Sequence, residues 1–296
     1  MGSPTERVIG ALYQIAGYMV SWTYMLPHTR VENWKKLREL AGLTDLSNPP
    51  RQLYYTGTWN PDLFTSCVAI VGSRRISDYG RRVIEKIIPR LIFEKKTIVS
   101  GFMYGVDQYA HEVCIANGGK TIAVLGWGIK HPLEGTDKKL AARIISSGGL
   151  LLSEWEDQKP TLWTFPVRNR IVAAISHEVI VVEAAVKSGS LITANIARRL
   201  KRRLWAVPGE ITSRTSAGCN SLIDQGYARM WLGDTPQQLP IMKDPLVQLV
   251  ADHVLTANDI ARKLGKPVSE IGAQLSLLTV SGQLIERGGK YYVSEN

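Results

Sequence analysis

Six short runs of apolar, largely β-branched residues alternate with stretches of helical periodicity in the middle of the chain. These runs are 67–71, 97–100, 121–125, 150–153, 179–182 and 204–207. Because they are apolar throughout rather than at every second position, they are typical of strands covered on both faces, as in a parallel sheet. Strands that alternate with helices in this way predict a doubly wound α/β domain with a mostly parallel sheet.

The stretches between these runs have apolar residues at helical spacing. In the first stretch, Ile84, Ile88 and Leu91 share one face, and Ser77 is a candidate N-cap. Helices that are apolar on one side are expected to cover the two faces of the sheet.

The chain divides into four segments by pattern. Residues 1–50 form a short N-terminal region that is helical in parts and has no assigned role, and residues 51–235 form the α/β domain. Residues 236–243 contain Pro and Gln and are expected to be a linker, and residues 244–296 are expected to form a small second domain.

The C-terminal segment has the pattern of a winged helix. Thr256 and Asp259 have the spacing of a capping box that opens a short helix, and a second helix is expected after Pro267. Gly288 and Gly289 separate two strand-like runs, which is a strong signal for a two-residue hairpin. Helices followed by such a hairpin predict a winged-helix domain.

The charge of the chain is uneven. It has 36 Lys and Arg against 26 Asp and Glu, a formal net charge of +10. Residues 72–100 hold eight basic and three acidic residues, residues 160–220 hold nine and three, and residues 243–296 hold six of each. The excess therefore lies in the α/β domain, where we expect both basic stretches to border strand-end loops, and it indicates an anionic partner.

Other classes of protein are disfavoured. No run of about 18 apolar residues predicts a transmembrane helix, and the N-terminus lacks the order of a secretory signal. Cys67, Cys114 and Cys219 are scattered without a CxxC pair, which disfavours a disulfide framework and a zinc ribbon. We therefore expect a cytoplasmic protein without a membrane partner.

Small and hydrogen-bonding residues follow the predicted strands. They include Gly72, Ser73, Arg74, Ser100, Gly101, Ser188, Gly189 and Ser190. Doubly wound sheets bind ligands at the carboxyl ends of their strands, where glycine lets backbone N–H groups approach an anion and a guanidinium matches phosphate. Neither a P-loop nor a dinucleotide fingerprint is present, so the pattern predicts phosphate binding without a nucleotide cofactor.

The stretch 165–170 is the most specific motif. Pro166 is well placed at a helix start, and Arg168, Asn169 and Arg170 would then lie in its exposed first turn. Arginines there oppose the helix dipole unless an external anion is near. Phe165 could stack on a base or pack in the core at the helix entry, and the two alternatives have equal weight.

Asp107 and His111 are spaced i, i+4 and could form an acid–base or metal pair. No third ligand is evident, so an N-terminal cap and a buried histidine are the favoured interpretation. No nucleophile–base arrangement stands out, and we expect no catalytic residue, no metal and no cofactor. The candidate residues therefore indicate a binding site and not a catalytic one.

The order of these motifs resembles the DNA-processing protein A family. The resemblance covers about residues 53–230 and is most specific at residues 165–170 and 188–194. It implies an extended Rossmann-like domain that binds single-stranded DNA, protects incoming DNA, forms a homodimer and loads the RecA recombinase during natural transformation. Members of the family are not regarded as enzymes.

Carried over to this chain, the resemblance implies a DNA pocket at strand-end and helix-start residues. These are Gly72, Ser73, Arg74, Ser100, Gly101, Phe165, Arg168, Asn169, Arg170, Ser188, Gly189 and Ser190, with Lys187 and Lys201 as weaker basic candidates. Two loops depart from the family pattern. Met103 and Tyr104 stand where the family commonly has Ala and Arg, and His131 stands where it usually has Tyr.

One alternative is an enzyme that resembles the nucleoside-monophosphate phosphoribohydrolases, which have a related scaffold. Those enzymes have a catalytic Glu after a glycine-rich loop. The corresponding position here is Asn195, after residues 188–194, and this disfavours hydrolysis.

A second alternative makes the winged helix the functional centre, as in a transcription regulator. A helix in a major groove normally comes with basic phosphate contacts, whereas this segment is neutral. We therefore expect an accessory or protein-contact role for it.

Overall fold

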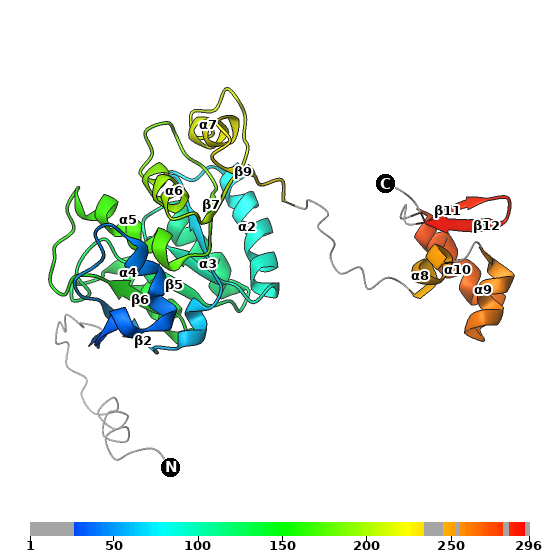
Figure 1. Ribbon diagram of the computed structural model, residues 1–296, viewed down its shortest axis with the longest axis horizontal. Helices are drawn as coiled ribbons and strands as arrows, with labels where there is room; N and C mark the ends of the chain where they lie inside the picture. Colours follow the sequence, from blue (N-terminus) through cyan, green and yellow to red (C-terminus); the bar gives the residue numbers. More distant parts are fainter. Residues whose placement is uncertain (1–26, 234–244, 253–254, 281–283, 294–296) are drawn as a thin grey trace, which may run out of the picture. The chain divides into compact units, whose positions relative to one another are not determined.

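The computed structural model describes residues 27–233, 245–252, 255–280 and 284–293. These residues form two compact units, one before and one after residue 234, and each unit has its own core (Figure 1). We refer to residues 27–233 as the α/β unit and to residues 245–293 as the C-terminal unit.

A nine-stranded sheet forms the centre of the α/β unit, in the order β1-β2-β6-β5-β4-β3-β7-β8-β9. The strands are β1 (Thr29–Arg30), β2 (Tyr54–Gly57), β3 (Cys67–Val71), β4 (Thr97–Ser100), β5 (Thr121–Val124), β6 (Leu150–Ser153), β7 (Glu178–Val181), β8 (Arg203–Ala206) and β9 (Arg229–Met230). Strands β3 to β9 pair in parallel, while β2 is antiparallel to both β1 and β6. The predicted α/β class with a mostly parallel sheet is confirmed.

Helices cover both faces of this sheet. They are α2 (Asp78–Phe93), α3 (Val106–Ala116), α4 (Gly135–Ser146), α5 (Thr164–Ile175), α6 (Ser190–Arg199) and α7 (Ala217–Asp224), together with the 3-10 helices η1 (Trp34–Lys36), η2 (Arg38–Asp45) and η3 (Pro61–Phe64). Helices α2, α3 and α4 pack on one face, and α5, α6, α7 and η2 pack on the other. Ser77 caps α2 as predicted, because its side chain accepts a hydrogen bond from the N–H of Gly80.

The N-terminal part of the α/β unit belongs to the main core. Trp34, Leu40 and Leu43 are buried in the same apolar cluster as the residues of α5 and α6. Residues 29–46 therefore pack as part of the α/β unit, although the sequence pattern separated the first 50 residues from it. The role of residues 1–26 lies outside the described residues.

The order of the strands creates a topological switch at β3. From β3 the chain proceeds outward through β4, β5 and β6, then crosses back to β7 and continues outward through β8 and β9. The connections that leave β3 and β7 therefore diverge at the carboxyl ends of these strands. Such a divergence leaves a crevice in which doubly wound proteins bind their ligands.

Arg168 on α5 is buried, with 2% of its surface exposed. Its guanidinium donates hydrogen bonds to the carbonyl oxygens of Gly101 and Val124, which follow or end strands β4 and β5. The prediction that Arg168 lies in an exposed first turn is therefore wrong. The side chain points under the sheet edge because these two carbonyls and the nearby carboxyl of Asp107 compensate the buried charge.

Asp107 and His111 are both buried on α3. Burial raises the pKa of the Asp107 carboxyl to about 6, and the Arg168 guanidinium limits that rise. The Nδ1 atom of His111 lies 2.7 Å from the hydroxyl of Thr121, and burial lowers the pKa of the ring to about 3. The predicted buried histidine is confirmed, whereas the prediction that Asp107 caps the helix is wrong, because the N-cap of α3 is Gly105 and no side chain caps that end.

The C-terminal unit consists of α8 (Pro245–Asp252), β10 (Leu255–Thr256), α9 (Ala257–Leu264), α10 (Val268–Val280), β11 (Leu284–Arg287) and β12 (Lys290–Val293). The strands form a small antiparallel sheet in the order β10-β12-β11. Thr256 and Asp259 form the predicted capping box. Gly288 and Gly289 have φ angles of 60° and 73°, which suit the hairpin turn between β11 and β12.

A search of the described residues for a helix long and apolar enough to cross a membrane finds none.

Replacing Arg168 by Met is expected to destabilise the α/β unit. The change removes a buried cation and leaves the Gly101 and Val124 carbonyls without donors, so the free energy of unfolding should fall by about 3 kcal/mol or more. Urea unfolding monitored by tryptophan fluorescence measures this, because all eight tryptophans precede residue 234. Arg199→Met, at an exposed position on α6, should change stability by less than about 0.5 kcal/mol. Equal losses in the two variants would contradict the assigned role of Arg168.

The buried His111 is expected to make stability depend on pH. Its folded pKa of about 3 lies below the ordinary value of 6.5, so the unfolded state binds more protons between these values. Stability from this residue is therefore complete above about pH 7 and lost as the pH falls toward 3, with a loss of about 2 kcal/mol at pH 5. Urea unfolding of the wild type and of His111→Gln at pH 7.5 and 5 should show a smaller loss in the variant. An identical loss would mean that His111 is not the titrating group.

Candidate nucleic-acid interface

A pocket of about 630 Å³ lies at the topological switch, and we call it the switch-point pocket. Its walls come from the loops after β3 and β4, from the first turns of α5 and from the β7–α6 loop. Residues from the loop before α7 complete it. The crevice expected from the strand order is therefore present at the carboxyl edge of the sheet.

The loop after β3 approaches its neighbours closely. A Cβ atom at Gly72 would lie 2.7 Å from a methyl group of Val106 and 2.9 Å from the carbonyl oxygen of Glu183, so a larger residue would displace this loop. The hydroxyl of Ser73 accepts a hydrogen bond from the N–H of Arg75 at 3.0 Å and donates one to the carbonyl oxygen of Arg75 at 2.9 Å. These contacts form a tight turn that presents Arg74 to the pocket.

Arg74 and Phe165 form one wall of the pocket. The guanidinium carbon of Arg74 lies 5.3 Å from the centroid of the Phe165 ring, within the range of a cation–π contact. A Cβ atom at Gly126 would lie 2.6 Å from the same ring, so glycine is required there for the ring to occupy this position. A cationic group and an aromatic face are thus held side by side.

The β7–α6 loop forms the opposite wall. The hydroxyl groups of Ser188 and Ser190 are 2.8 Å apart, and the side-chain amide of Asn169 donates to the carbonyl oxygen of Gly189 at 3.2 Å. Helix α6 starts at Ser190, so the positive end of its dipole lies at the pocket. Lys187 also lines the wall.

The pocket is electrostatically positive. Arg74, Arg75, Lys187 and Arg214 line it together with the buried Arg168, and Asp107 is the carboxylate among its described lining residues. Glu183, which follows β7, is directed elsewhere, since its carboxylate accepts hydrogen bonds from the N–H and the hydroxyl of Ser77. Clustered cations, hydroxyls and a helix N-terminus are suited to bind phosphate groups.

Most of the sequence-predicted site residues meet in this pocket. Those that line it are Gly72, Ser73, Arg74, Gly101, Phe165, Arg168, Asn169, Lys187, Ser188, Gly189 and Ser190. Phe165 lies at the pocket wall and also packs against the buried Trp127, and stacking of its ring on a base stays a prediction.

Three predicted residues are not brought to the pocket. The hydroxyl of Ser100 is buried and donates to the carbonyl oxygen of Ile70 at 2.6 Å. Arg170 forms an ion pair with Glu154 at 2.6 Å, so its guanidinium is directed away from the pocket. Lys201 follows the C-terminus of α6, whose N-terminus forms the pocket wall, and therefore lies at the other end of that helix.

Arg75, Arg214 and Thr215 line the pocket but were missed as site residues. Arg75 directly follows the Gly72–Arg74 turn, and Arg214 lies in the loop after β8. Their positions after parallel strands were the available signal, since the carboxyl ends of such strands meet at one edge.

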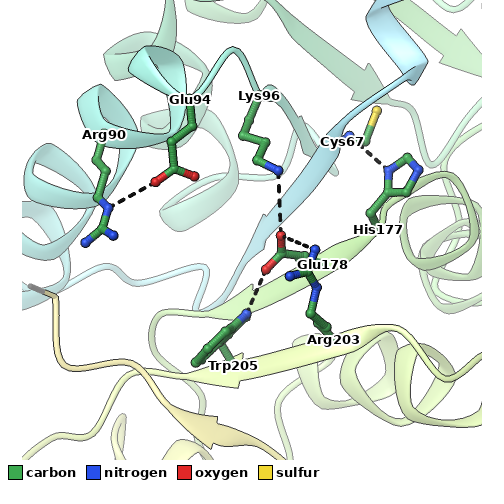
Figure 2. Close-up of polar contacts among 8 residues, drawn as sticks. All are labelled: Cys67, Arg90, Glu94, Lys96, His177, Glu178, Arg203 and Trp205. Carbon is green, nitrogen blue, oxygen red and sulfur yellow. Dashed lines mark hydrogen bonds and ion pairs between the residues drawn. The ribbon is translucent and has the colours of Figure 1, made fainter. Parts of the chain in front are cut away.

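Both basic stretches contribute residues to the pocket at the strand-end loops, but some of their cations lie elsewhere. Figure 2 shows basic side chains at the amino edge of the sheet, where β4, β7 and β8 begin. There Glu178 pairs with Lys96 at 3.9 Å and with Arg203 at 3.0 Å, and it also accepts a hydrogen bond from the Trp205 indole at 3.0 Å. Helices α2 and α6 lead from the carboxyl edge back to the amino edge, so the basic residues that follow them lie away from the pocket. There Lys96 and Arg203 form ion pairs within the protein.

The three cysteines are buried and unpaired. Burial raises the pKa of each thiol to about 12, so none of them is a reactive thiolate at neutral pH.

The chain matches the family model for DNA recombination-mediator protein A over residues 32–239. It is 36% identical over 251 residues to Protein Smf of Escherichia coli, covering 76% of this chain and 67% of the relative. It is 40% identical over 185 residues to the DNA processing protein DprA of Streptococcus pneumoniae, covering 62% and 64% of the two chains. The matches thus span about two thirds or less of these relatives.

Comparison with solved structures points to the same protein family. The chain superposes on the DNA processing protein A of Streptococcus pneumoniae with a TM-score of 0.61 and 38% identity, covering 70% of this chain and 71% of that one. It superposes on the Helicobacter pylori protein, described for its single-stranded DNA binding mode, with a TM-score of 0.61 and 28% identity, covering 75% and 97%. This chain therefore belongs to the DNA recombination-mediator protein A family.

Proposed function

We propose that this protein binds single-stranded DNA through the switch-point pocket. The observation that supports this best is the wall formed by Arg74 and Phe165, where a cation and an aromatic face lie 5.3 Å apart. Single-stranded DNA offers a phosphate and an unstacked base in every nucleotide, and proteins that bind it combine basic grooves with aromatic stacking.

The polar groups of the pocket suit a DNA backbone rather than a particular sequence. Arg74 and Lys187 supply charge, Ser188 and Ser190 supply hydroxyl groups, and the start of α6 adds the positive end of a helix dipole. Contacts of this kind position a strand without specifying its bases. The relative from Helicobacter pylori is described as binding single-stranded DNA, which supports the same assignment here.

We further propose that the pocket binds its ligand without a chemical step. Its lining carboxylate, Asp107, is buried beside Arg168, whose guanidinium compensates its charge. Asn195 lies on α6 where the phosphoribohydrolases would need their glutamate. Both observations favour binding over hydrolysis of a nucleotide.

The family supports a role in DNA processing and recombination, in which the protein protects single strands. Loading of the RecA recombinase, action in natural transformation, assembly as a homodimer and cytoplasmic location are proposals that follow from the resemblance. We also propose that the C-terminal unit is a winged-helix domain with an accessory or protein-contact role, because its sequence segment is neutral.

Replacing Arg74 by Ala is expected to lower the affinity for a short oligothymidylate about five-fold or more. The loss of one phosphate contact should also reduce the slope of log affinity against log salt by about 0.7. Fluorescence anisotropy at two or more salt concentrations measures both effects, and Lys187→Ala should behave in the same way. Duplex DNA of equal length should bind more weakly than the single strand.

Lys201→Ala is the matched control, since it removes one positive charge at the other end of α6. Its affinity and salt slope should equal those of the wild type. Unchanged binding in both Arg74→Ala and Lys187→Ala, or tighter binding of duplex than of single-stranded DNA, would refute the proposed function.

A further inference from the structure

A second pocket of about 700 Å³ adjoins the switch-point pocket, and we call it the aromatic pocket. It is bounded by the loop after β4, the loop between β5 and α4, and the start of α5. Phe165 lines both pockets, so its ring is their common wall. A ligand held in the first pocket can therefore extend directly into the second.

Aromatic rings dominate the second pocket. The ring of Trp127 lies 6.1 Å from that of Phe165 and 6.1 Å from that of His131, in edge-to-face arrangements. Tyr104, with 60% of its surface exposed, stands at the rim. Rings at different orientations around one cavity offer stacking faces to a planar heterocycle.

The loop that bears Tyr104 is held in an unusual conformation. Phe102, two residues earlier, has a φ of 62°, in the left-handed region that a bulky residue rarely adopts. Its ring is buried and lies 6.3 Å from the ring of Trp127. The packing of Phe102 thus stabilises a strained turn and fixes where Tyr104 lies, as is common where a loop meets a ligand.

The charge of the aromatic pocket is opposite to that of its neighbour. Among the described residues that line it, no Lys or Arg occurs, whereas Glu134 and Asp137 contribute carboxylates. Burial lowers the pKa of His131, so this ring is neutral at pH 7 and adds no cation. The two carboxylates therefore disfavour a phosphate group in this pocket. They do not disfavour a neutral ring that has N–H donors.

We propose that the aromatic pocket receives a nucleobase of the DNA strand whose phosphates bind in the switch-point pocket, with Tyr104 and His131 as stacking residues. The inference rests on the proposed function, because it requires a strand in the first pocket. It adds a separate subsite: phosphates bind on the Arg74 side of Phe165, and an unstacked base binds on the Tyr104 side.

The test compares two ligands with the same number of phosphates, a short oligothymidylate and an abasic strand of equal length. Replacing Tyr104 by Ala should lower the affinity for the oligothymidylate about five-fold or more and leave the affinity for the abasic strand unchanged. His131→Ala should act in the same direction, and Tyr104→Phe should retain wild-type affinity because the ring is kept. A strand with 2-aminopurine at one position should show quenching that is reduced in Tyr104→Ala.

Phe93→Ala is the control for loss of an exposed ring, since Phe93 is 77% exposed at the C-terminal end of α2, far along that helix from its start at the carboxyl edge. It should bind both ligands as the wild type does. The subsite is refuted if Tyr104→Ala and His131→Ala leave oligothymidylate binding unchanged, or weaken binding of both ligands equally. A wild-type protein that binds neither ligand would instead refute the proposed function itself.

Discussion

A guanidinium group in the interior must find partners, and the position of Arg168 satisfies this constraint by connecting α5 to two strand ends and to α3. From α5 it reaches the backbone carbonyls that end β5 and follow β4, with Asp107 of α3 nearby. A Cβ atom at Gly101 would lie 2.7 Å from this guanidinium, so the turn after β4 must be glycine. The same anchoring sets the start of α5, where Phe165 forms the pocket wall and Asn169 reaches the β7–α6 loop. The geometry of the site therefore depends on the buried Arg168 as well as on residues at the surface.

The distribution of the basic residues follows from the topology. Each crossover helix begins near the carboxyl edge of the sheet and ends near the amino edge, so a basic run along one helix is divided between two surfaces. At the amino edge, Glu178 sits between Lys96 and Arg203 and compensates their charge (Figure 2). At the carboxyl edge no comparable acid faces Arg74 and Lys187 among the described lining residues, apart from the buried Asp107. Net charge by segment therefore indicates a kind of partner, whereas the strand ends indicate where that partner binds.

The sequence predicted the parts of the molecule whose residues are constrained locally. The short apolar runs gave correct strands because a strand buried on both faces has few polar positions, and the glycine-rich strand ends identified most of the pocket. The edge strands β1 and β9 have two residues each and exposed side chains, so no periodicity could reveal them. Arg168 could not be predicted as buried, because its partners are backbone carbonyls on distant strands. The position of Lys201 was predictable, since the ten residues of α6 span about 15 Å away from the pocket.

The pairing of a basic pocket with an aromatic one that has no lining Lys or Arg among the described residues has a consequence for the choice between single-stranded and duplex DNA. Phosphates are present in both forms, so the contacts of Arg74 and Lys187 alone discriminate weakly. A base can enter the aromatic pocket only after it leaves its stack and its partner, which costs a few kcal/mol in a duplex and much less in a single strand. With Phe165 between the two pockets, each nucleotide that occupies both must be unpaired. Discrimination would then arise from the aromatic pocket, while most of the affinity arises from the basic one.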